Sequence, residues 1–113
     1  MSDRLDYIEF PSMDRERTSS FFQKAFGWGL VSYGPDYDAI TQAGIDGGID
    51  QSVDRVAATM AVVRTDDLDA AEARVIAAGG NITRPQFDFP GGRRFHCREP
   101  GGNELAVYVE RSE

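Results

Sequence analysis

The side chain best suited to proton transfer in this 113-residue chain is its single histidine. His96 has the only side chain whose unperturbed pKa lies near neutrality, and it stands at alternate spacing with Arg94 and Arg98. Alternate positions of a strand share one face of a sheet. His96 is therefore a candidate for acid–base chemistry or anion binding, or else an ordinary sheet histidine whose pKa the two arginines lower.

Glu9 is the second candidate, because it lies two residues after Tyr7 in a segment that alternates like a strand. A carboxylate on the wall of a binding site must find a partner or acquire a raised pKa. Arg64 or Arg94 could supply that partner. A structural salt bridge and a ligand contact remain equal alternatives for Glu9.

Aromatic side chains offer a further surface on which a planar or apolar ligand could stack. Phe21, Phe22 and Phe26 follow helical spacing and are assigned to the core. Cys97 has no partner at CxxC spacing, so we expect a buried and unreactive thiol. The aromatic residues that remain as candidates are Tyr7, Trp28, Tyr33, Tyr37 and Tyr108.

Two segments with the same layout position these candidates. Each has an alternating strand, an aspartate that can cap a helix, a helix with an apolar stripe, and a glycine that ends it. Asp14 and Asp67 are 53 positions apart, and Gly27 and Gly80 are separated by the same 53. One offset shared by several landmarks indicates a duplicated unit.

The pattern within each copy predicts its elements. The first strand of each copy is Leu5 to Phe10 or Thr59 to Arg64, and Asp46-Gly47-Gly48 is expected to be a turn. Gly79 should end the second helix in a left-handed turn. The apolar stripe of the first helix is Thr18, Phe21, Phe22 and Ala25, and that of the second is Leu68, Ala71, Val75 and Ala78. The later strands of the first copy are Leu30 to Tyr33, Tyr37 to Thr41 and Gly48 to Gln51. Those of the second copy are Asn81 to Arg84, Arg93 to Arg98 and Glu104 to Val109.

The fold class predicted from this order is α+β, with two βαβββ modules in one domain of residues 1–113. The modules span about 4–51 and 59–110, and residues 52–58 form the linker. One helix per module covers only one face of a sheet, so we expect the other faces to form a concave cup in a curved mixed sheet. Strand alternation assigns to this cup Tyr7, Glu9, Met60, Val62, His96, Ala106 and Tyr108.

Three runs of residues together resemble the vicinal oxygen chelate superfamily, which includes glyoxalases, bleomycin-resistance proteins and extradiol dioxygenases. They are Tyr7-Ile8-Glu9-Phe10-Pro11, Phe26-Gly27-Trp28, and Glu99-Pro100-Gly101-Gly102-Asn103-Glu104-Leu105. The chain is most similar to the branch related to lactoylglutathione lyase. The resemblance implies the cup-shaped fold. It does not select a reaction, because the superfamily holds metal-dependent lyases, isomerases, dioxygenases and epimerases as well as drug-binding proteins without catalytic activity.

Catalytic members of that superfamily hold a divalent metal with His, Gln or Glu side chains in the cup. The resemblance places these ligand positions on Tyr7, Met60, Ala106 and a residue near positions 49–52, where Asp50 is the only carboxylate. Ala106 has no donor atom, Met60 offers a soft thioether, and Tyr7 would have to lose a proton of pKa about 10. We therefore expect no metal and no cofactor.

The composition of the chain argues against several classes of binding partner. The net charge of −7 and the pI of about 4.6 argue against nucleic acid, which is bound by clustered Lys and Arg. The sequence has no apolar window long enough for a membrane span and no signal-like leader, and its lone cysteine cannot form an intrachain disulfide. We expect a cytoplasmic protein that does not bind membranes.

The first functional hypothesis is a metal-independent small-molecule-binding protein whose ligand is unknown. The alternative is a lyase, isomerase or dioxygenase-type enzyme that uses a non-family metal site or acid–base chemistry by His96 and Glu9. A domain that only mediates protein association is a third possibility. We also expect a homodimer, because sheets covered on one face leave apolar area to bury.

Overall fold

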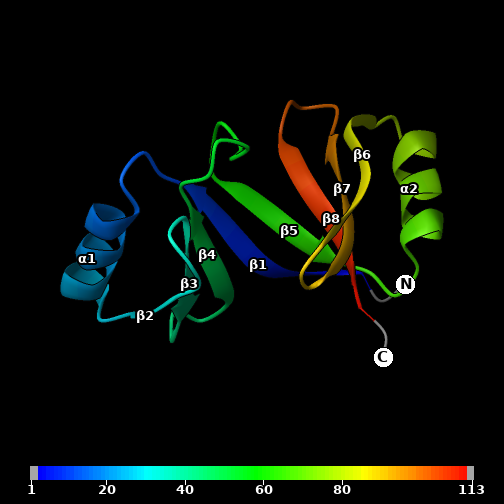
Figure 1. Ribbon diagram of the computed structural model, residues 1–113. Coiled ribbons are helices and arrows are strands. Elements are labelled where there is room, and N and C mark those ends of the chain that lie inside the picture. The colour runs from blue at the N-terminus through cyan, green and yellow to red at the C-terminus, as the bar shows by residue number, and fades with distance from the viewer. Residues whose placement is uncertain (1–2, 112–113) are drawn as a thin grey trace. The chain divides into compact units, whose positions relative to one another are not determined.

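A computed structural model describes residues 3–111 of the chain and confirms the α+β class with two successive βαβββ modules (Figure 1). Residues 1–2 and 112–113 of the expected 1–113 domain lie outside the described part. The elements of the first module are β1 (Arg4–Pro11), α1 (Arg15–Phe26), β2 (Gly29–Ser32), β3 (Tyr37–Thr41) and β4 (Asp46–Asp50). Those of the second are β5 (Met60–Arg64), α2 (Leu68–Ala77), β6 (Asn81–Phe89), β7 (Gly92–Arg98) and β8 (Glu104–Glu110).

The chain divides into two compact units. The first unit is Tyr7–Met60. The second unit contains residues 3–6 and 61–111 of the described chain. Neither helix in the described residues is long and apolar enough to cross a membrane.

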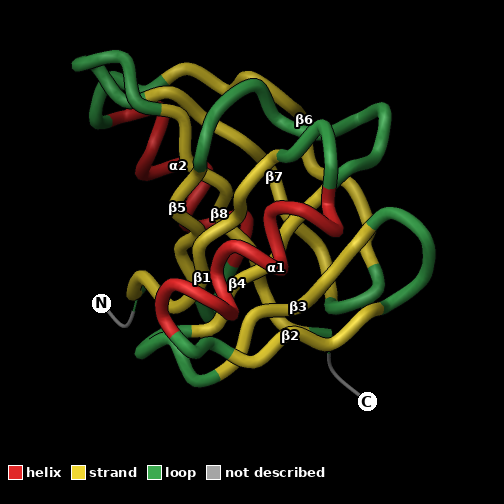
Figure 2. Tube along the Cα trace, turned by 90° about the vertical axis from the view of Figure 1, so that its left-hand side faces the viewer, coloured by secondary structure: helices red, strands yellow, loops and turns green. Residues whose placement is uncertain are grey.

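The sheet of the first unit has the order β2-β3-β4-β1, and α1 packs against β2, β3 and β4 (Figure 2). β1 runs parallel to β4, whereas β2, β3 and β4 are antiparallel neighbours. Strand alternation turns Ile40 and Ile49 inward, where both are almost fully buried. The ring of Phe10 lies 5.1 Å from that of Phe22 on α1, so the helix covers the face predicted for it.

Helix α1 is rotated relative to its predicted stripe. Its N-terminus is capped as expected, since the Asp14 carboxylate accepts a hydrogen bond from the backbone N–H of Arg17 at 3.1 Å. However, Phe21 and Phe26 are each 58% exposed, so their assignment to the core was wrong. The one buried residue of α1 is Ser19.

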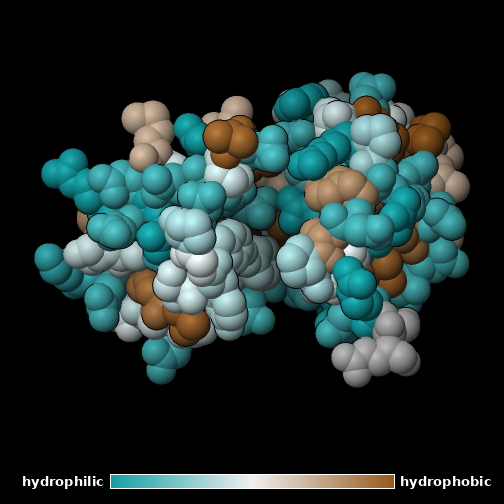
Figure 3. Space-filling view, viewed as in Figure 1, coloured by the Kyte–Doolittle hydropathy of each residue, from teal (hydrophilic) through white to brown (hydrophobic). Residues whose placement is uncertain are grey.

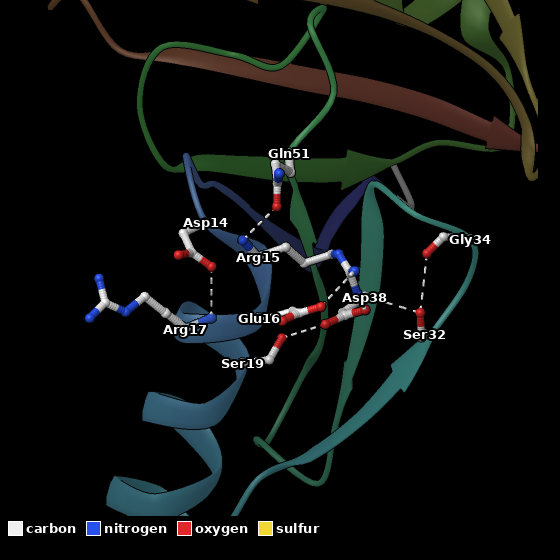
Figure 4. Close-up of polar contacts among 9 residues, drawn as sticks. All are labelled: Asp14, Arg15, Glu16, Arg17, Ser19, Ser32, Gly34, Asp38 and Gln51. Carbon is white, nitrogen blue, oxygen red and sulfur yellow. Dashed lines mark hydrogen bonds and ion pairs between the residues drawn. The ribbon is translucent and has the colours of Figure 1, made fainter.

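The rotation has a physical cause in an ion pair beneath the helix (Figure 4). Arg15 Nη1 lies 2.6 Å from Oδ1 of Asp38 on β3, and Ser19 Oγ donates to the other carboxylate oxygen at 2.5 Å. Burial alone would raise the pKa of Asp38, but the hydrogen bonds from Ser19 and Arg15 outweigh it and leave this pKa below its usual value. Because a buried carboxylate requires these partners, α1 must turn Arg15 and Ser19 toward the sheet.

The second unit has an apolar core of the predicted kind. Its sheet has the order β5-β8-β7-β6, and α2 packs on β6, β7 and β8. Asp67 caps the helix by accepting from Ala70 N at 3.1 Å, and Gly79 follows its end with a left-handed φ of 98°. Ala78, expected in the stripe, is exposed because the helix ends one residue before it. The core between helix and sheet consists of Leu68, Ala71, Phe95, Cys97 and Val107, with Val63, Val75, Ile82, Leu105 and Val109 around it.

Two strand predictions are corrected by the structure. Asp46-Gly47-Gly48, expected to be a turn, begins β4, and the turn lies at residues 42–45 instead. β6 does not end at Arg84 but continues through Pro85 to Phe89. Proline is tolerated there because β6 is the outermost strand of its sheet and its pairing with β7 shifts register on either side of Arg84.

The first residues of the described chain are held by the second unit. Asp3 accepts hydrogen bonds from Thr65 Oγ1 at 2.8 Å and from Arg74 Nη2 at 2.6 Å. Further along β1, Asp6 Oδ2 accepts from the hydroxyl of Tyr108 at 2.7 Å. β1 therefore contributes its start to the second unit and pairs with β4 from Tyr7 onward.

We predict that Asp38→Asn lowers the free energy of unfolding by about 3 to 5 kcal/mol, because the substitution leaves the guanidinium of Arg15 without its buried counter-charge. The folded pKa of Asp38 lies below the usual 3.8, so the pair stabilises the fold above that value and loses this stabilisation as the pH falls through the folded pKa. Chemical denaturation at pH 7 and below pH 4 measures both effects. Glu16→Gln is the control, since that carboxylate is 85% exposed and lies 4.0 Å from Arg15. An equal loss in both variants would contradict the prediction.

Candidate functional site

The helix-free face of the second sheet carries two rows of side chains, set by the strand register. In the first row, Val62 pairs with Ala106, Ala106 with His96, and His96 with Arg84. In the second, Arg64 pairs with Tyr108, Tyr108 with Arg94, and Arg94 with Phe87. Their neighbours Phe95, Cys97 and Val107 form the core under α2, so these two rows point to the opposite side.

A buried histidine positions an arginine at the centre of this face. The guanidinium of Arg94 approaches Nε2 of His96 through Nε at 3.1 Å and through Nη2 at 2.8 Å. A guanidinium only donates hydrogen bonds, so Nε2 must accept and the imidazole is neutral with its proton on Nδ1. His96 is 4% exposed. Burial, followed by the charges of Arg94 and Arg84, lowers the pKa of His96 to about 4, although Glu104 opposes the shift.

The sequence predicted that the pKa of His96 is lowered, but it did not predict the main cause. Arg98, which shares the face by alternation, donates from Nη1 to the carbonyl of Gly102 at 2.9 Å and is exposed. The second arginine that acts on His96 is Arg84, from the neighbouring strand β6. Desolvation of the imidazole is a larger cause of the lowered pKa than the charge of either arginine.

Aromatic rings from β6 stand beside the arginines. The guanidinium carbon of Arg84 lies 3.7 Å from the ring centre of Phe87, and that of Arg94 lies 5.6 Å from the ring centres of both Phe87 and Phe89. The imidazole of His96 lies edge-on to Phe87 with ring centres 5.6 Å apart. This arrangement combines positive charge with flat apolar surface on one side of the sheet.

Tyr108 lies between Arg64 and Arg94 in the second row of this face. Its hydroxyl donates to Asp6, and its ring lies 6.1 Å from that of Phe89. Burial and the carboxylate of Asp6 raise the pKa of Tyr108 to about 12, so the phenol keeps its proton. Arg64 forms an ion pair with Glu110.

The remaining predicted cup residues belong to the first unit. The hydroxyls of Tyr7 and Tyr37 are hydrogen-bonded to each other over Gly48, and a side chain at Gly48 would collide with both phenols. Glu9 is buried beside them, paired in register with Gly48. Met60 is also buried.

The structure thus brings four predicted site residues together in the second unit: Val62, His96, Ala106 and Tyr108. A cup shared with the first-unit residues stays a prediction. The predicted cup did not include Arg84, Phe87 and Phe89, and the predicted strand ended at Arg84, whereas β6 continues to Phe89. The alternation Gln86-Phe87-Asp88-Phe89 before the Pro90-Gly91 turn is the signal that could have found them.

The donor chemistry does not fit the metal site that the fold family implies. Among residues 3–111 there is no group of three or more His, Cys, Asp or Glu side chains that could hold a metal ion. The phenol of Tyr7 is engaged by Tyr37, and one oxygen of Asp50 accepts from the backbone N–H of Ser52 at 2.8 Å. Ala106 has no donor atom at all. No chemistry is therefore assigned to a metal here.

Comparison with known proteins identifies the family. The profile of the Glyoxalase/Bleomycin resistance protein/Dioxygenase superfamily matches residues 4–107, and the chain belongs to this superfamily. No curated protein is a significant match in sequence.

Solved structures agree on the fold at low sequence identity. A glyoxalase/bleomycin resistance protein/dioxygenase superfamily member from Vibrio splendidus is 15% identical with a TM-score of 0.72, covering 97% of this chain and 100% of its own. A methylmalonyl-CoA epimerase from Mycobacterium tuberculosis is 14% identical with a TM-score of 0.72, covering 96% and 88%. A hypothetical protein from Bacillus halodurans is 8% identical with a TM-score of 0.80, covering 100% and 98%.

We predict that the single histidine titrates with a midpoint near pH 4 in the folded protein. An unfolded histidine binds its proton at about pH 6.5, so His96 destabilises the fold progressively as the pH falls from about 6.5 to 4, and not above that range. The Cε1–H resonance followed by NMR gives the midpoint directly. Arg94→Met should raise it only part of the way, because burial is the larger cause. Arg98→Met should leave it unchanged. A midpoint at or above 6.5 in the unsubstituted protein would show that His96 is solvated.

Proposed function

We propose that this superfamily member is a metal-independent small-molecule-binding protein, and that the helix-free face of the second sheet contacts the ligand. The observation that carries the proposal is the guanidinium of Arg94, held by a neutral buried histidine and flanked by Phe87 and Phe89. Small-molecule sites combine apolar walls with a few oriented polar groups. This face has both.

Binding is favoured over acid–base catalysis by the pKa values on this face. A general acid or base works best with a pKa near the working pH. His96 has a pKa of about 4 and Tyr108 of about 12, so at neutral pH the first is a weak base and the second a weak acid. The imidazole of His96 instead accepts a hydrogen bond that fixes the direction of Arg94.

Metal independence is supported by the family ligand positions. Of the four, Ala106 offers no donor, Met60 offers a buried thioether, and the phenol of Tyr7 is already hydrogen-bonded. These side chains therefore do not support a catalytic metal of the kind that other members of the family hold.

We predict that the purified protein contains less than one equivalent of any divalent metal, and that ligand binding survives chelation. Elemental analysis gives the metal content, and a thermal-shift screen of small molecules on EDTA-treated protein gives the binding. A ligand at 100 times its Kd should stabilise the fold by about 2.7 kcal/mol. His96→Ala and Arg94→Met should weaken the hits. One equivalent of metal per chain whose removal abolishes binding would refute the proposal.

We also propose that the protein forms a homodimer. Phe21, Phe26 and Tyr33 of the first unit are 58%, 58% and 67% exposed, which is unusual for large aromatic side chains. On the side displayed in Figure 3, hydrophobic residues form small patches among hydrophilic ones. Burial of such residues between two copies would remove apolar area from water.

Light scattering at micromolar concentration should therefore give twice the monomer mass of 12.5 kDa. Phe21→Ser together with Phe26→Ser should shift this mass toward the monomer, since two exposed aromatic side chains are lost from the apolar surface. The matched control is Val53→Ser, because Val53 is 94% exposed on the loop between the modules. A monomeric mass for the unsubstituted chain would refute the dimer.

A further inference from the structure

We infer that Gln86 on β6 is a positioning residue of the helix-free face, where it holds the ring of Phe87 against the imidazole of His96. Gln86 acts from the other side of the strand, through contacts with α2 and β7. Phe87 is one of the aromatic walls of the proposed ligand site. That use of the ring rests on the proposed function, whereas the geometry that Gln86 imposes on Phe87 and His96 does not.

Backbone pairing alone fixes β6 poorly at this point. β6 is the outermost strand of its sheet, with β7 as its neighbour. Between the paired positions Arg84 and Phe87, two residues of β6 lie opposite one residue of β7. Such a bulge interrupts the ladder of hydrogen bonds, and Pro85 within it has no N–H to contribute. The position of Phe87 therefore needs a further constraint.

The amide of Gln86 supplies that constraint through three hydrogen bonds. Its Nε2 donates to Oδ1 of Asp69 at 2.8 Å and to Oε1 of Glu72 at 3.2 Å, two neighbouring carboxylates of α2. Its Oε1 accepts from Nε of Arg93 on β7 at 3.0 Å. Ionised carboxylates only accept and a guanidinium only donates, so a single orientation of the amide satisfies all three partners. Hydrogen bonds to charged groups are the stronger kind, and these tie the bulge to the helix and to the sheet at once.

Strand alternation transmits this constraint to the other face. Neighbouring residues of a strand point to opposite sides, so an amide fixed toward α2 turns Phe87 toward the helix-free face. There its ring centre lies 5.6 Å from that of the His96 imidazole and 3.7 Å from the guanidinium carbon of Arg84. A slip by one residue would turn Phe87 to the helix side, and a slip by two would bring Asp88 against the carboxylates of α2. Gln86 thus specifies the register in which Phe87 meets His96.

Three substitutions of Gln86 separate its contacts with α2 from its contact with Arg93. Gln86→Met keeps a similar length and removes every polar atom. Gln86→Lys can donate to both carboxylates of α2 but cannot accept from Arg93. Gln86→Glu can accept from Arg93 but is repelled by Asp69 and Glu72.

The readouts are the Cε1–H resonance of His96 and the nuclear Overhauser contact between its imidazole and the ring of Phe87, both at pH 7. The pKa of His96 of about 4 keeps the imidazole neutral at that pH, so the resonance responds to the position of the nearby ring and not to titration. Phe87→Leu removes the ring and gives the direction of the displacement.

Gln86→Met and Gln86→Glu should displace the His96 resonance in that direction and weaken the Overhauser contact. Gln86→Lys should keep both signals close to those of the unsubstituted chain, because its ammonium group preserves the link to α2. Asp69→Ala with Glu72→Ala removes the same link from the helix side and should act as Gln86→Met does. Adding Gln86→Met to this pair should displace the resonance no further, since the substitutions break one shared contact.

Asp88→Asn is the control, because Asp88 lies in the same strand and its carboxylate accepts from Arg93 at 2.8 Å on the exposed edge. It should leave both signals unchanged.

An unchanged His96 resonance in Gln86→Met, even with a lower melting temperature, would show that Gln86 only stabilises the fold and would overturn the inference. Equal displacements in Gln86→Lys and Gln86→Glu, or a displacement by Asp88→Asn as large as that by Gln86→Met, would overturn it too. If Gln86→Met does not fold, the comparison of Gln86→Lys with Gln86→Glu still decides. Since no readout needs a ligand, a small-molecule screen without hits would count against the proposed function and leave this role of Gln86 in place.

Discussion

Each sheet of this protein has only one helix to cover it, and that constraint determines what the other residues can do. A sheet face packed against a helix must supply apolar or fully paired side chains. The opposite face carries arginines, tyrosines and a histidine beside apolar residues, and its buried histidine is paired with an arginine. In the second unit the division is sharp, with Phe95 and Cys97 in the core and Arg94 and His96 on the other side of the same strand.

The two modules meet the constraint in different ways. α2 rests on a purely apolar cluster, whereas α1 is oriented by the buried pair of Arg15 and Asp38 with Ser19 beside it. An ion pair fixes the rotation of a helix more strictly than an apolar stripe, because its atoms must meet at hydrogen-bond distance. The consequence is visible on the outer side of α1, where Phe21 and Phe26 are turned into solvent.

On the helix-free face of the second sheet, burial changes the chemistry of the histidine. A solvated imidazole near neutrality suits proton transfer, but desolvation and two arginines keep His96 uncharged. The residue then acts as a hydrogen-bond acceptor that holds a guanidinium.

The sequence by itself determined the repeat, the order of elements, the caps Asp14 and Asp67, and the faces of the strands, because these depend on local spacing and on residues near in the chain. Through the family resemblance it also predicted that the metal-ligand positions carry poor donors, since that prediction needs only residue types. The tertiary structure decided the rotation of α1, which depends on Asp38 in a strand 23 residues from Arg15. It likewise decided the extension of β6 past Pro85, which depends on its edge position. Arg84, Phe87 and Phe89 reach Arg94 and His96 only through the shifted pairing of β6 with β7, and no local pattern specifies such a register.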